Sequence, residues 1–270
     1  MSLHLNGVAL VTGAGSGIGR ECALGYAAEG AKAVVFADLS YERAVDAAQE
    51  SETVATNPIF KAMAVRVDPA DLGSVADMIS ATMRALGRID YFVNSTWIGL
   101  SGTEADAPEP EDVQLAKTKG TLHCIRDVVQ IMKNQAVGKY KARGKVREVG
   151  RGSIVTIGAP GSFATSETAP ETSEEYVLSL TKKAALDLAA HGIRLNAVCP
   201  GWVENGSVNN GQSDPEAIKN MIPMTRMAKA EEIADVVLFL SSPRASYVTG
   251  GTWTVDGGVS LQSQDPVEQE

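Results

Sequence analysis

Closely spaced glycines near the start of the chain are suited to binding an anionic group through backbone atoms. The segment from Thr12 to Arg20 lies between an apolar run and a helical pattern, and every second residue from 13 to 19 is glycine. Gly13 permits a tight turn, Gly17 lets the backbone approach a ligand, and Gly19 allows close helix packing. Free N–H groups and the positive end of the helix dipole attract phosphate. The spacing therefore predicts a dinucleotide-binding loop, contacted through Gly13, Gly15, Ser16, Gly17 and Ile18.

An acidic residue at the end of the next apolar run predicts which dinucleotide is bound. Asp38 follows the run Ala33–Ala37, at the distance expected of an acid that binds ribose. Its carboxylate would accept hydrogen bonds from both ribose hydroxyls and repel a 2′-phosphate, which favours NAD(H). Arg20 and Arg43 could partly neutralise such a phosphate, so NADP(H) stays open. The alternative is that Asp38 only caps the following helix.

Short apolar runs alternate with longer helical patterns along the chain. Such alternation is typical of βαβ units, whose right-handed crossovers place helices on both faces of a parallel sheet. We predict an α/β fold: a single Rossmann-type doubly wound domain with a seven-stranded parallel sheet over residues 1–262, then a polar tail over 263–270. Strands are expected at Val8–Thr12, Ala33–Ala37, Ala62–Val67, Tyr91–Asn94, Ser153–Ile157, Arg194–Cys199 and Thr252–Val255. Helices are expected at Gly19–Glu29, Tyr41–Glu52, Leu72–Leu86, Asp112–Met132, Ser173–Ala190 and Glu231–Ser241.

Length and composition exclude several classes of protein. The chain has 270 residues, of which 44% are hydrophobic, enough for one sizeable core. A net charge of −9 argues against a nucleic-acid surface, and no apolar run is long enough to span a membrane. The start of the chain lacks a secretory pattern, so we expect a cytoplasmic protein. Cys22, Cys124 and Cys199 are expected to be reduced, mostly buried thiols, and no cysteine or histidine pair has metal-ligand spacing.

One stretch departs from the acidic character of the chain. The range Lys133–Arg151 contains seven basic residues and a single acid, Glu148. We predict a solvated, lysine-rich loop that leads into the fifth strand. In this fold such a loop lies at the amino ends of the strands, opposite the ligand-binding edge.

Four ordered motifs together resemble the short-chain dehydrogenase/reductase family. Besides the glycine pattern, Val67-Asp68 matches the adenine-contacting acid of that family, and residues 193–201 resemble its sixth strand and the turn that holds the nicotinamide amide. Residues 240–258 are similar to its carboxyl-terminal signature. The resemblance implies assembly into dimers or tetramers. It also implies further cofactor contacts at Asp68, Asn94, Pro200, Gly201 and Val203.

The catalytic residues of that family are not recovered. Its members commonly use asparagine, serine, tyrosine and lysine, but no tyrosine here is followed four residues later by lysine. Counting from neighbouring motifs places Lys117 at the asparagine position and the pair Gly158-Ala159 at the serine position, with Ser162 nearby. The same counting places Pro170 at the tyrosine and Glu174 at the lysine. A second register, which shortens the helix, puts Ser179 four residues before Lys183.

These replacements favour a substrate that needs no proton. Hydride addition to a neutral ketone creates an alkoxide, whereas addition to an iminium ion neutralises a charge. We predict that Glu167 and Glu174 face the cation, although glutamates at a helix start can simply complement its dipole. Lys117 either reaches a carboxylate or carbonyl of the substrate, or packs its stem in a subunit interface.

An apolar pocket is expected around the reacting group. Trp97 replaces a glycine found beside the cofactor in the family, where it would form an aromatic wall or else pack away from the site. Ala159 and Pro170 would complete the pocket. The segment Glu204–Met227 usually forms a lid in this fold, and its methionines suit either an irregular apolar ligand or core packing.

The pattern resembles non-typical reductases of fungal prenylated indole-alkaloid pathways. The resemblance implies an NAD(P)H-dependent reductase of an iminium or other C=N group in a bulky apolar molecule. Such an enzyme could also template an intramolecular Diels–Alder cyclisation. Two alternatives are a catalytically silent dinucleotide-binding member and an ordinary carbonyl reductase that uses a displaced Tyr176.

Overall fold

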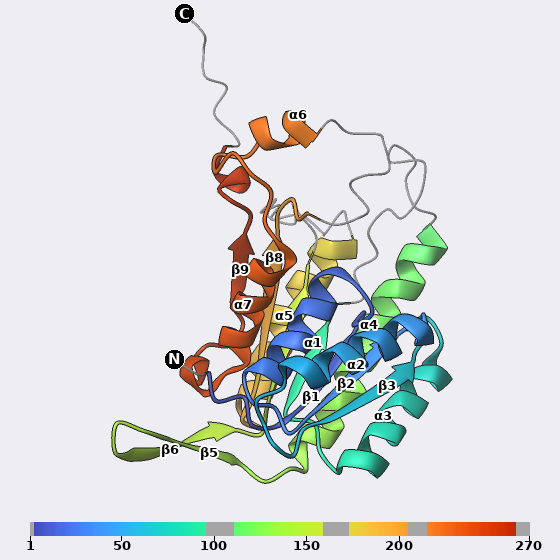
Figure 1. Cartoon of the computed structure of the whole chain (residues 1–270), viewed down its shortest axis with the longest axis vertical. Helices are drawn as coiled ribbons and strands as arrows, with labels where there is room; N and C mark the ends of the chain where they lie inside the picture. The colour runs from blue at the N-terminus through green and yellow to red at the C-terminus, as the bar shows by residue number, and fades with distance from the viewer. Residues whose placement is uncertain (1–2, 96–110, 159–172, 205–214, 263–270) are drawn as a thin grey trace, which may run out of the picture.

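The computed structural model describes residues 3–95, 111–158, 173–204 and 215–262. In these ranges seven parallel strands form one sheet, in the order β3-β2-β1-β4-β7-β8-β9, with helices on both faces (Figure 1). The predicted doubly wound Rossmann-type sheet is confirmed. Its strands are β1 (Val8–Thr12), β2 (Ala33–Asp38), β3 (Lys61–Arg66), β4 (Tyr91–Asn94), β7 (Gly152–Ile157), β8 (Ile193–Pro200) and β9 (Thr252–Val255). The main helices are α1 (Gly17–Ala28), α2 (Tyr41–Val54), α3 (Leu72–Leu86), α4 (Glu111–Lys133), α5 (Ser173–Ala189) and α7 (Ala230–Ser241).

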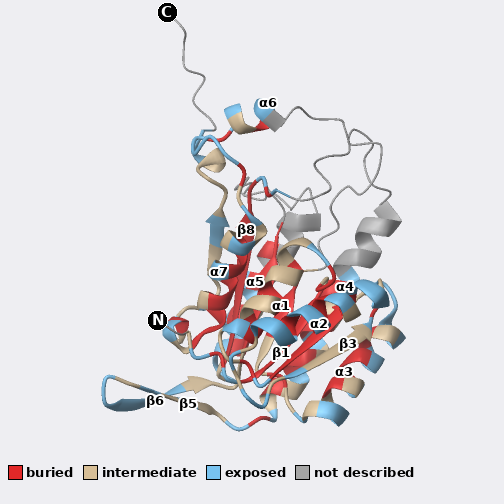
Figure 2. Ribbon diagram, in the orientation of Figure 1, coloured by how far each residue is buried: buried red, intermediate tan, exposed pale blue. Residues whose placement is uncertain are grey.

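Two hydrophobic cores lie on opposite faces of this sheet. Helices α1, α2 and α7 cover one face, and α3, α4 and α5 cover the other. Neighbouring residues of β1 illustrate the division: Val11 packs in the first core and Leu10 in the second. Both side chains are fully buried, as expected of a central parallel strand (Figure 2). The sheet is thus fixed from both sides, and the ends of its strands are free to present functional groups.

Local capping explains where two of the helices begin. The hydroxyl of Ser40 accepts a hydrogen bond from the Arg43 N–H at 3.4 Å and caps α2. The carboxylate of Asp71 accepts one from the Gly73 N–H at 2.8 Å and caps α3. The alternative that Asp38 caps α2 is therefore wrong, because Ser40 occupies that position.

The lysine-rich stretch is a hairpin, so the prediction of a loop was wrong. Strands β5 (Gly138–Ala142) and β6 (Lys145–Gly150) pair antiparallel, and the hairpin projects from the lower end of the molecule (Figure 1). Its two-residue connection has positive φ at both Arg143 (50°) and Gly144 (74°). That combination matches the twist of paired strands and favours a tight hairpin. The expected position at the amino ends of the sheet strands is correct, because β6 leads directly into β7.

The described part of the predicted lid segment includes a short helix, α6 (Pro215–Asn220). Its methionines were expected either to contact an apolar ligand or to pack in the core, and they differ in this respect. Met227 is buried beside Ile218 and Ile222, whereas Met221 and Met224 are 57% and 59% exposed. The exposed pair is therefore available to contact a ligand, and Met227 is not.

Two expectations from composition concern thiols and membranes. Cys22, Cys124 and Cys199 are all buried and free, as predicted, and burial raises the pKa of each thiol. Among the described residues, no helix has both the length and the apolar character required to cross a bilayer.

Candidate dinucleotide site

The glycine loop joins β1 to α1 in the geometry that an anion site requires. Gly13 (φ 68°) and Gly17 (φ 52°) adopt left-handed conformations that favour glycine. A Cβ on Gly19 would lie 2.2 Å from the carbonyl oxygen of Gly13, so only glycine lets α1 approach the loop this closely. Ser16 makes no side-chain capping bond, and the first turn of α1 contains no acidic residue. The positive end of α1 therefore remains available to a phosphate.

Asp38 lies at the end of β2, beside this loop. Its Oδ2 accepts a hydrogen bond from the Gly15 N–H and its Oδ1 accepts one from the Ser40 N–H, both at 2.9 Å. These bonds fix the orientation of the carboxylate. Each oxygen keeps a second lone pair, so the group can still accept from two ribose hydroxyls. A Cβ on Gly15 would lie 2.8 Å from Asp38 Cγ, which explains why Gly15 is needed at this contact.

The two arginines near this site differ in availability. Arg20 forms an ion pair with Glu50 of α2, so its charge is already compensated. The side chain of Arg43 is exposed and begins next to Gly15, where Arg43 Cβ would be 2.7 Å from an added Cβ. Arg43 is thus the arginine placed to meet a 2′-phosphate.

Asn94 lies where the strand order reverses between β1 and β4, the usual ligand position in such sheets. Its Oδ1 accepts from the Thr12 hydroxyl at 3.0 Å, and its Nδ2 donates to the Thr121 hydroxyl at 3.2 Å. The Asn94 side chain is 4% exposed and ties β1 and β4 to α4. These contacts make it a positioning residue for the edge of the sheet. The roles of Thr12 and Thr121 were not predictable from the sequence, because their contacts with Asn94 join residues far apart in the chain.

The segment after β3 forms the part of the dinucleotide site that is predicted to contact the adenine. Asp68 is half-buried, and its Oδ1 accepts a hydrogen bond from the Ala70 N–H at 2.9 Å. Helix α4 approaches this segment closely at Gly120, where an added Cβ would lie 2.0 Å from the carbonyl oxygen of Pro69. Gly120 therefore fixes the distance between α4 and the loop that carries Asp68.

The turn that is predicted to contact the nicotinamide of the dinucleotide follows β8. The Gly201 N–H donates to the Val255 carbonyl at 2.9 Å, and a Cβ on Gly201 would lie 2.7 Å from Asp256 Cα. Val203 is buried and pairs with Ala228 in an isolated β-bridge. The turn beginning at Pro200 is thus held on both sides by backbone contacts.

Asp256 stabilises this end through its own hydrogen bonds. Its carboxylate accepts from the Ser260 N–H at 2.7 Å and from the Gly258 N–H at 2.9 Å. Burial acts to raise the pKa of Asp256, but these hydrogen bonds outweigh it, so the pKa lies below its usual range. The group is therefore a carboxylate at neutral pH.

One predicted catalytic residue and the three predicted pocket residues lie outside the described part of the structure. Glu167, Trp97, Ala159 and Pro170 fall in the omitted ranges. Lys117 lies on α4, and Glu174 and Tyr176 lie in the first turn of α5, but the described side chains do not include them. Their roles stay predictions. Lys183 of the second register is exposed on α5, and that register also stays a prediction.

Gly158 and Ala159 occupy the position of the family serine, and the structure describes Gly158. Gly158 follows β7, is buried, and donates its N–H to the Val198 carbonyl at 2.8 Å. A Cβ on Gly158 would lie 3.0 Å from the sulfur of Cys199. The backbone at this position therefore fits tightly against β8.

The sheet order, the glycine loop and the carboxylate after β2 define a nucleotide-binding α/β reductase fold. A family model described as enoyl-(acyl carrier protein) reductase matches residues 13–260. The chain is 51% identical to the short-chain dehydrogenase anuF of Penicillium roqueforti, over 98% of this chain and 99% of that protein. The chain belongs to the short-chain dehydrogenase/reductase family.

Solved structures agree with this assignment. The crystal structure of a short-chain dehydrogenase/reductase from Mycobacterium marinum has a TM-score of 0.78 and 29% identity, and covers 96% of this chain and 97% of its own. The 3-ketoacyl-(acyl-carrier-protein) reductase of Brucella melitensis, crystallised with NADH, has a TM-score of 0.75 and 28% identity, and covers 94% and 98%. Membership of this oxidoreductase family implies a nicotinamide dinucleotide cofactor.

Proposed function

We propose that this protein is an NADH-preferring reductase of cationic C=N groups in bulky, apolar small molecules. The observation that carries the proposal is the lack of a Tyr-x-x-x-Lys pair anywhere in the chain, in a protein of a family that commonly reduces with it. The dinucleotide site keeps its loop and its oriented Asp38 carboxylate. A dinucleotide site with its binding groups in place, beside a catalytic site without the family's tyrosine and lysine, favours a reduction that needs no acid.

The cofactor preference follows from the groups around Asp38. The fixed carboxylate would bind the ribose hydroxyls and repel a 2′-phosphate. Arg20 is compensated by Glu50, which leaves Arg43 alone to attract that phosphate. The Brucella relative crystallised with NADH supports the same preference.

The reaction is a hydride transfer to carbon. Reduced nicotinamide supplies the hydride with its electron pair, the new C–H bond forms at the iminium carbon, and the π electrons of the C=N bond return to nitrogen. The product is a neutral amine, so no proton is transferred. The loss of a general acid lowers the rate of carbonyl reduction by about 10²–10⁴-fold. It does not lower the rate of this step, which needs no proton.

Acidic side chains would hold the cationic substrate. Glu174 is the second residue of α5, at the position that counting from motifs assigns to the family lysine, and Glu167 precedes the same helix. A carboxylate there stabilises a cation that an ammonium would repel. Helix α4 packs against α5. Lys117, on α4, would contact a carbonyl elsewhere on the substrate.

Apolar side chains near the end of β8 support a bulky substrate. Trp202 is 40% exposed directly after the β8 turn, and Met221 and Met224 are exposed in the segment that follows. Trp97, Ala159 and Pro170 would complete the same pocket. A pocket that folds an apolar diene and dienophile together would also template an intramolecular Diels–Alder cyclisation.

The test is turnover with NADH and NADPH against matched cyclic iminium ions and ketones. We expect iminium reduction with NADH, and little ketone reduction. Glu174→Gln should lower kcat/KM for the iminium ion about 10-fold or more, while Glu42→Gln, an exposed glutamate of α2, should have no effect. Cofactor binding without reduction of any substrate would instead favour a silent member that acts as a sensor or partner subunit.

A second candidate function is ordinary carbonyl reduction. The Brucella relative is a 3-ketoacyl reductase by name, and Tyr176 lies in the first turn of α5. A displaced phenol there would replace the missing proton donor. Tyr176→Phe separates the two candidates: a loss of at least 100-fold in ketone reduction supports this one, and unchanged activity eliminates it.

A further inference from the structure

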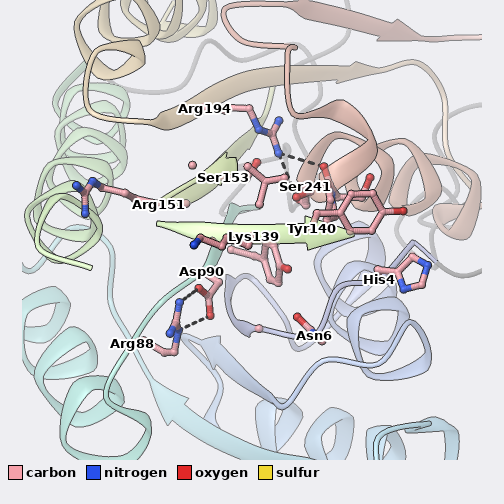
Figure 3. A pocket seen from close by; sticks show the side chains of 18 of the residues that line it. His4, Asn6, Arg88, Asp90, Lys139, Tyr140, Arg151, Ser153, Arg194 and Ser241 are labelled. Carbon is pink, nitrogen blue, oxygen red and sulfur yellow. Dashed lines mark hydrogen bonds and ion pairs between the residues drawn. The ribbon is translucent and has the colours of Figure 1, made fainter. Parts of the chain in front are cut away.

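A second candidate binding site lies at the amino ends of the sheet strands, opposite the glycine loop. A cavity of about 400 Å³ opens beneath the β5–β6 hairpin (Figure 3). Its floor is formed where β1, β4, β7 and β8 begin, at Gly7, Asp90, Ser153 and Arg194. This volume is in the range of small-molecule sites.

The lining of this amino-edge cavity is strongly basic, although the chain carries a net charge of −9. Among the described residues that line it, Asp90 is the single acidic side chain. Both oxygens of Asp90 accept from Arg88, at 2.5 and 2.8 Å, so this pair adds no net charge to the lining. The six basic side chains that line the cavity are Lys32, Arg88, Lys139, Lys141, Arg151 and Arg194.

Arg194 places an uncompensated charge at the back of the cavity. It is 8% exposed, and its guanidinium donates to the carbonyl oxygens of Leu240, Val248, Ser241 and Ser242. No carboxylate of the described residues pairs with it, and its Nε–H has no hydrogen-bond partner there. Burial lowers the pKa of Arg194 to about 10, so the group is still a cation at neutral pH. A buried cation without a counter-ion favours the entry of an anion.

Three exposed lysines surround the mouth of the cavity. Among the described residues, none of Lys32, Lys139 and Lys141 forms an ion pair. Glu148 lies opposite Lys139 in the hairpin register, but it does not line the cavity. Three unpaired ammonium groups therefore line the same cavity as a buried guanidinium, and charged donors of this kind bind oxyanions strongly.

The hairpin is held over the cavity by specific contacts. Arg147 donates to the Pro243 carbonyl at 2.7 Å, and its guanidinium carbon lies 5.4 Å from the centroid of the Tyr140 ring. His4 packs against the same ring at a centroid distance of 5.5 Å. Lys139 and Lys141 are therefore presented from an anchored strand.

We propose that the amino-edge cavity binds a compact multivalent oxyanion, whose charge resides on phosphate or carboxylate groups. The ligand would bridge the hairpin lysines and the basic floor of the sheet. Because such a ligand binds the folded state, it would stabilise the protein and hold the hairpin in place.

The test is thermal unfolding of the full-length protein with inorganic phosphate or citrate, against sodium chloride at equal ionic strength. Saturating NADH is present throughout, so that the glycine loop is occupied. We expect phosphate, citrate or both to raise Tm by about 5 °C at concentrations well above Kd. A larger shift with phosphate indicates a phosphate ligand, and a larger shift with citrate indicates a carboxylate ligand.

Two double variants of the same hairpin locate the site. Lys139→Gln/Lys141→Gln removes two charges from the cavity lining, and Arg143→Gln/Lys145→Gln removes two from the turn, outside it. We expect the first variant to lose most of the Tm shift and the second to keep it. Equal loss in both would show a general surface-charge effect. No loss in either, or no shift with any anion, would also overturn the proposal.

Discussion

The two edges of the sheet concentrate positive charge by different means. At the carboxyl edge the glycine loop uses backbone N–H groups and a helix end, with Asp38 as a selective acid beside them. At the amino edge the charge comes from lysine and arginine side chains around a buried Arg194. Backbone groups are fixed by the fold, whereas side chains depend on the hairpin that presents them. The first arrangement suits a constant cofactor, whereas the hairpin lysines of the second, Lys139 and Lys141, can be altered without disturbing the sheet.

The largest expected effect is at Arg194. Arg194→Met would remove the charged donor of four backbone carbonyls, of which, among the described residues, only the Ser241 carbonyl has no second donor. We expect a loss of about 3–5 kcal/mol in the free energy of unfolding, because several hydrogen bonds from a charged group are lost together. Urea unfolding measures it. Arg84→Met, on the exposed surface of α3, is the control and should change stability by less than about 0.5 kcal/mol. Similar losses in both variants would mean that the buried bonds contribute little.

At the carboxyl edge, Gly19→Ala should be nearly as damaging. The new Cβ would meet the Gly13 carbonyl at 2.2 Å, and we expect a cost of about 3 kcal/mol together with weaker NADH binding. The control is Gly73→Ala on α3, where the nearest atom is a side-chain oxygen of Asp71 at 3.2 Å. Stability by urea and affinity by fluorescence titration would be measured for both. Unchanged NADH affinity in Gly19→Ala would contradict the role of this loop.

Asp38→Asn tests the selective acid, and it also removes one of the two hydrogen bonds that the carboxylate accepts from the Gly15 and Ser40 N–H groups. The amide keeps one acceptor oxygen and removes the repulsion of a 2′-phosphate. We expect NADH affinity to fall about 10-fold, with the ratio of NADPH to NADH affinity rising, because charged hydrogen bonds are worth about 1.5–3 kcal/mol. Asp46→Asn on α2 serves as the control. A ratio that does not move would remove Asp38 from the basis of cofactor preference.

The smallest expected effect concerns pH and Asp256. Its pKa is lowered in the folded state, so it contributes stability above the unfolded pKa, and that contribution is lost as pH falls through the folded pKa. Because the group is partly solvated, we expect less than about 1 kcal/mol. Asp256→Asn should therefore lower stability at pH 7 and reduce the loss of stability between about pH 5 and 2. If Asp256→Asn lost as much stability at acid pH as the unsubstituted protein, the contribution assigned to Asp256 would be wrong.

The fold and the cofactor half were predictable because their signals are local. Alternating apolar runs indicated all seven sheet strands, and the glycine spacing indicated the loop where Gly13 and Gly17 have positive φ. The hairpin was missed although its signal was present. Alternating residues flank Arg143-Gly144, and glycine after a polar residue is typical of a two-residue turn. The same segment is rich in lysine and arginine, which is equally typical of a solvated loop.

The sites that depend on distant residues were less predictable. Thr12, Asn94 and Thr121 are joined through two hydrogen bonds, yet 27 residues separate Asn94 from Thr121. Likewise, the amino-edge cavity collects residues from the starts of four strands. The spacing of residues in the sequence does not predict these two clusters, because they form only when the sheet brings distant residues together. The replaced catalytic positions could be counted from motifs, but counting gives no orientation for their side chains.

The tight fit of Gly158 against Cys199 constrains how the family serine could be regained. A serine at 158 would bring its Cβ to about 3.0 Å from the sulfur, so the larger residue requires the thiol to move or shrink. Reintroducing a hydroxyl there therefore takes two coordinated substitutions, such as Gly158→Ser with Cys199→Ala. Either change alone is unfavourable, since one crowds the strand and the other leaves a void. The contact between Gly158 and Cys199 therefore couples the residue choices at the ends of two adjacent strands.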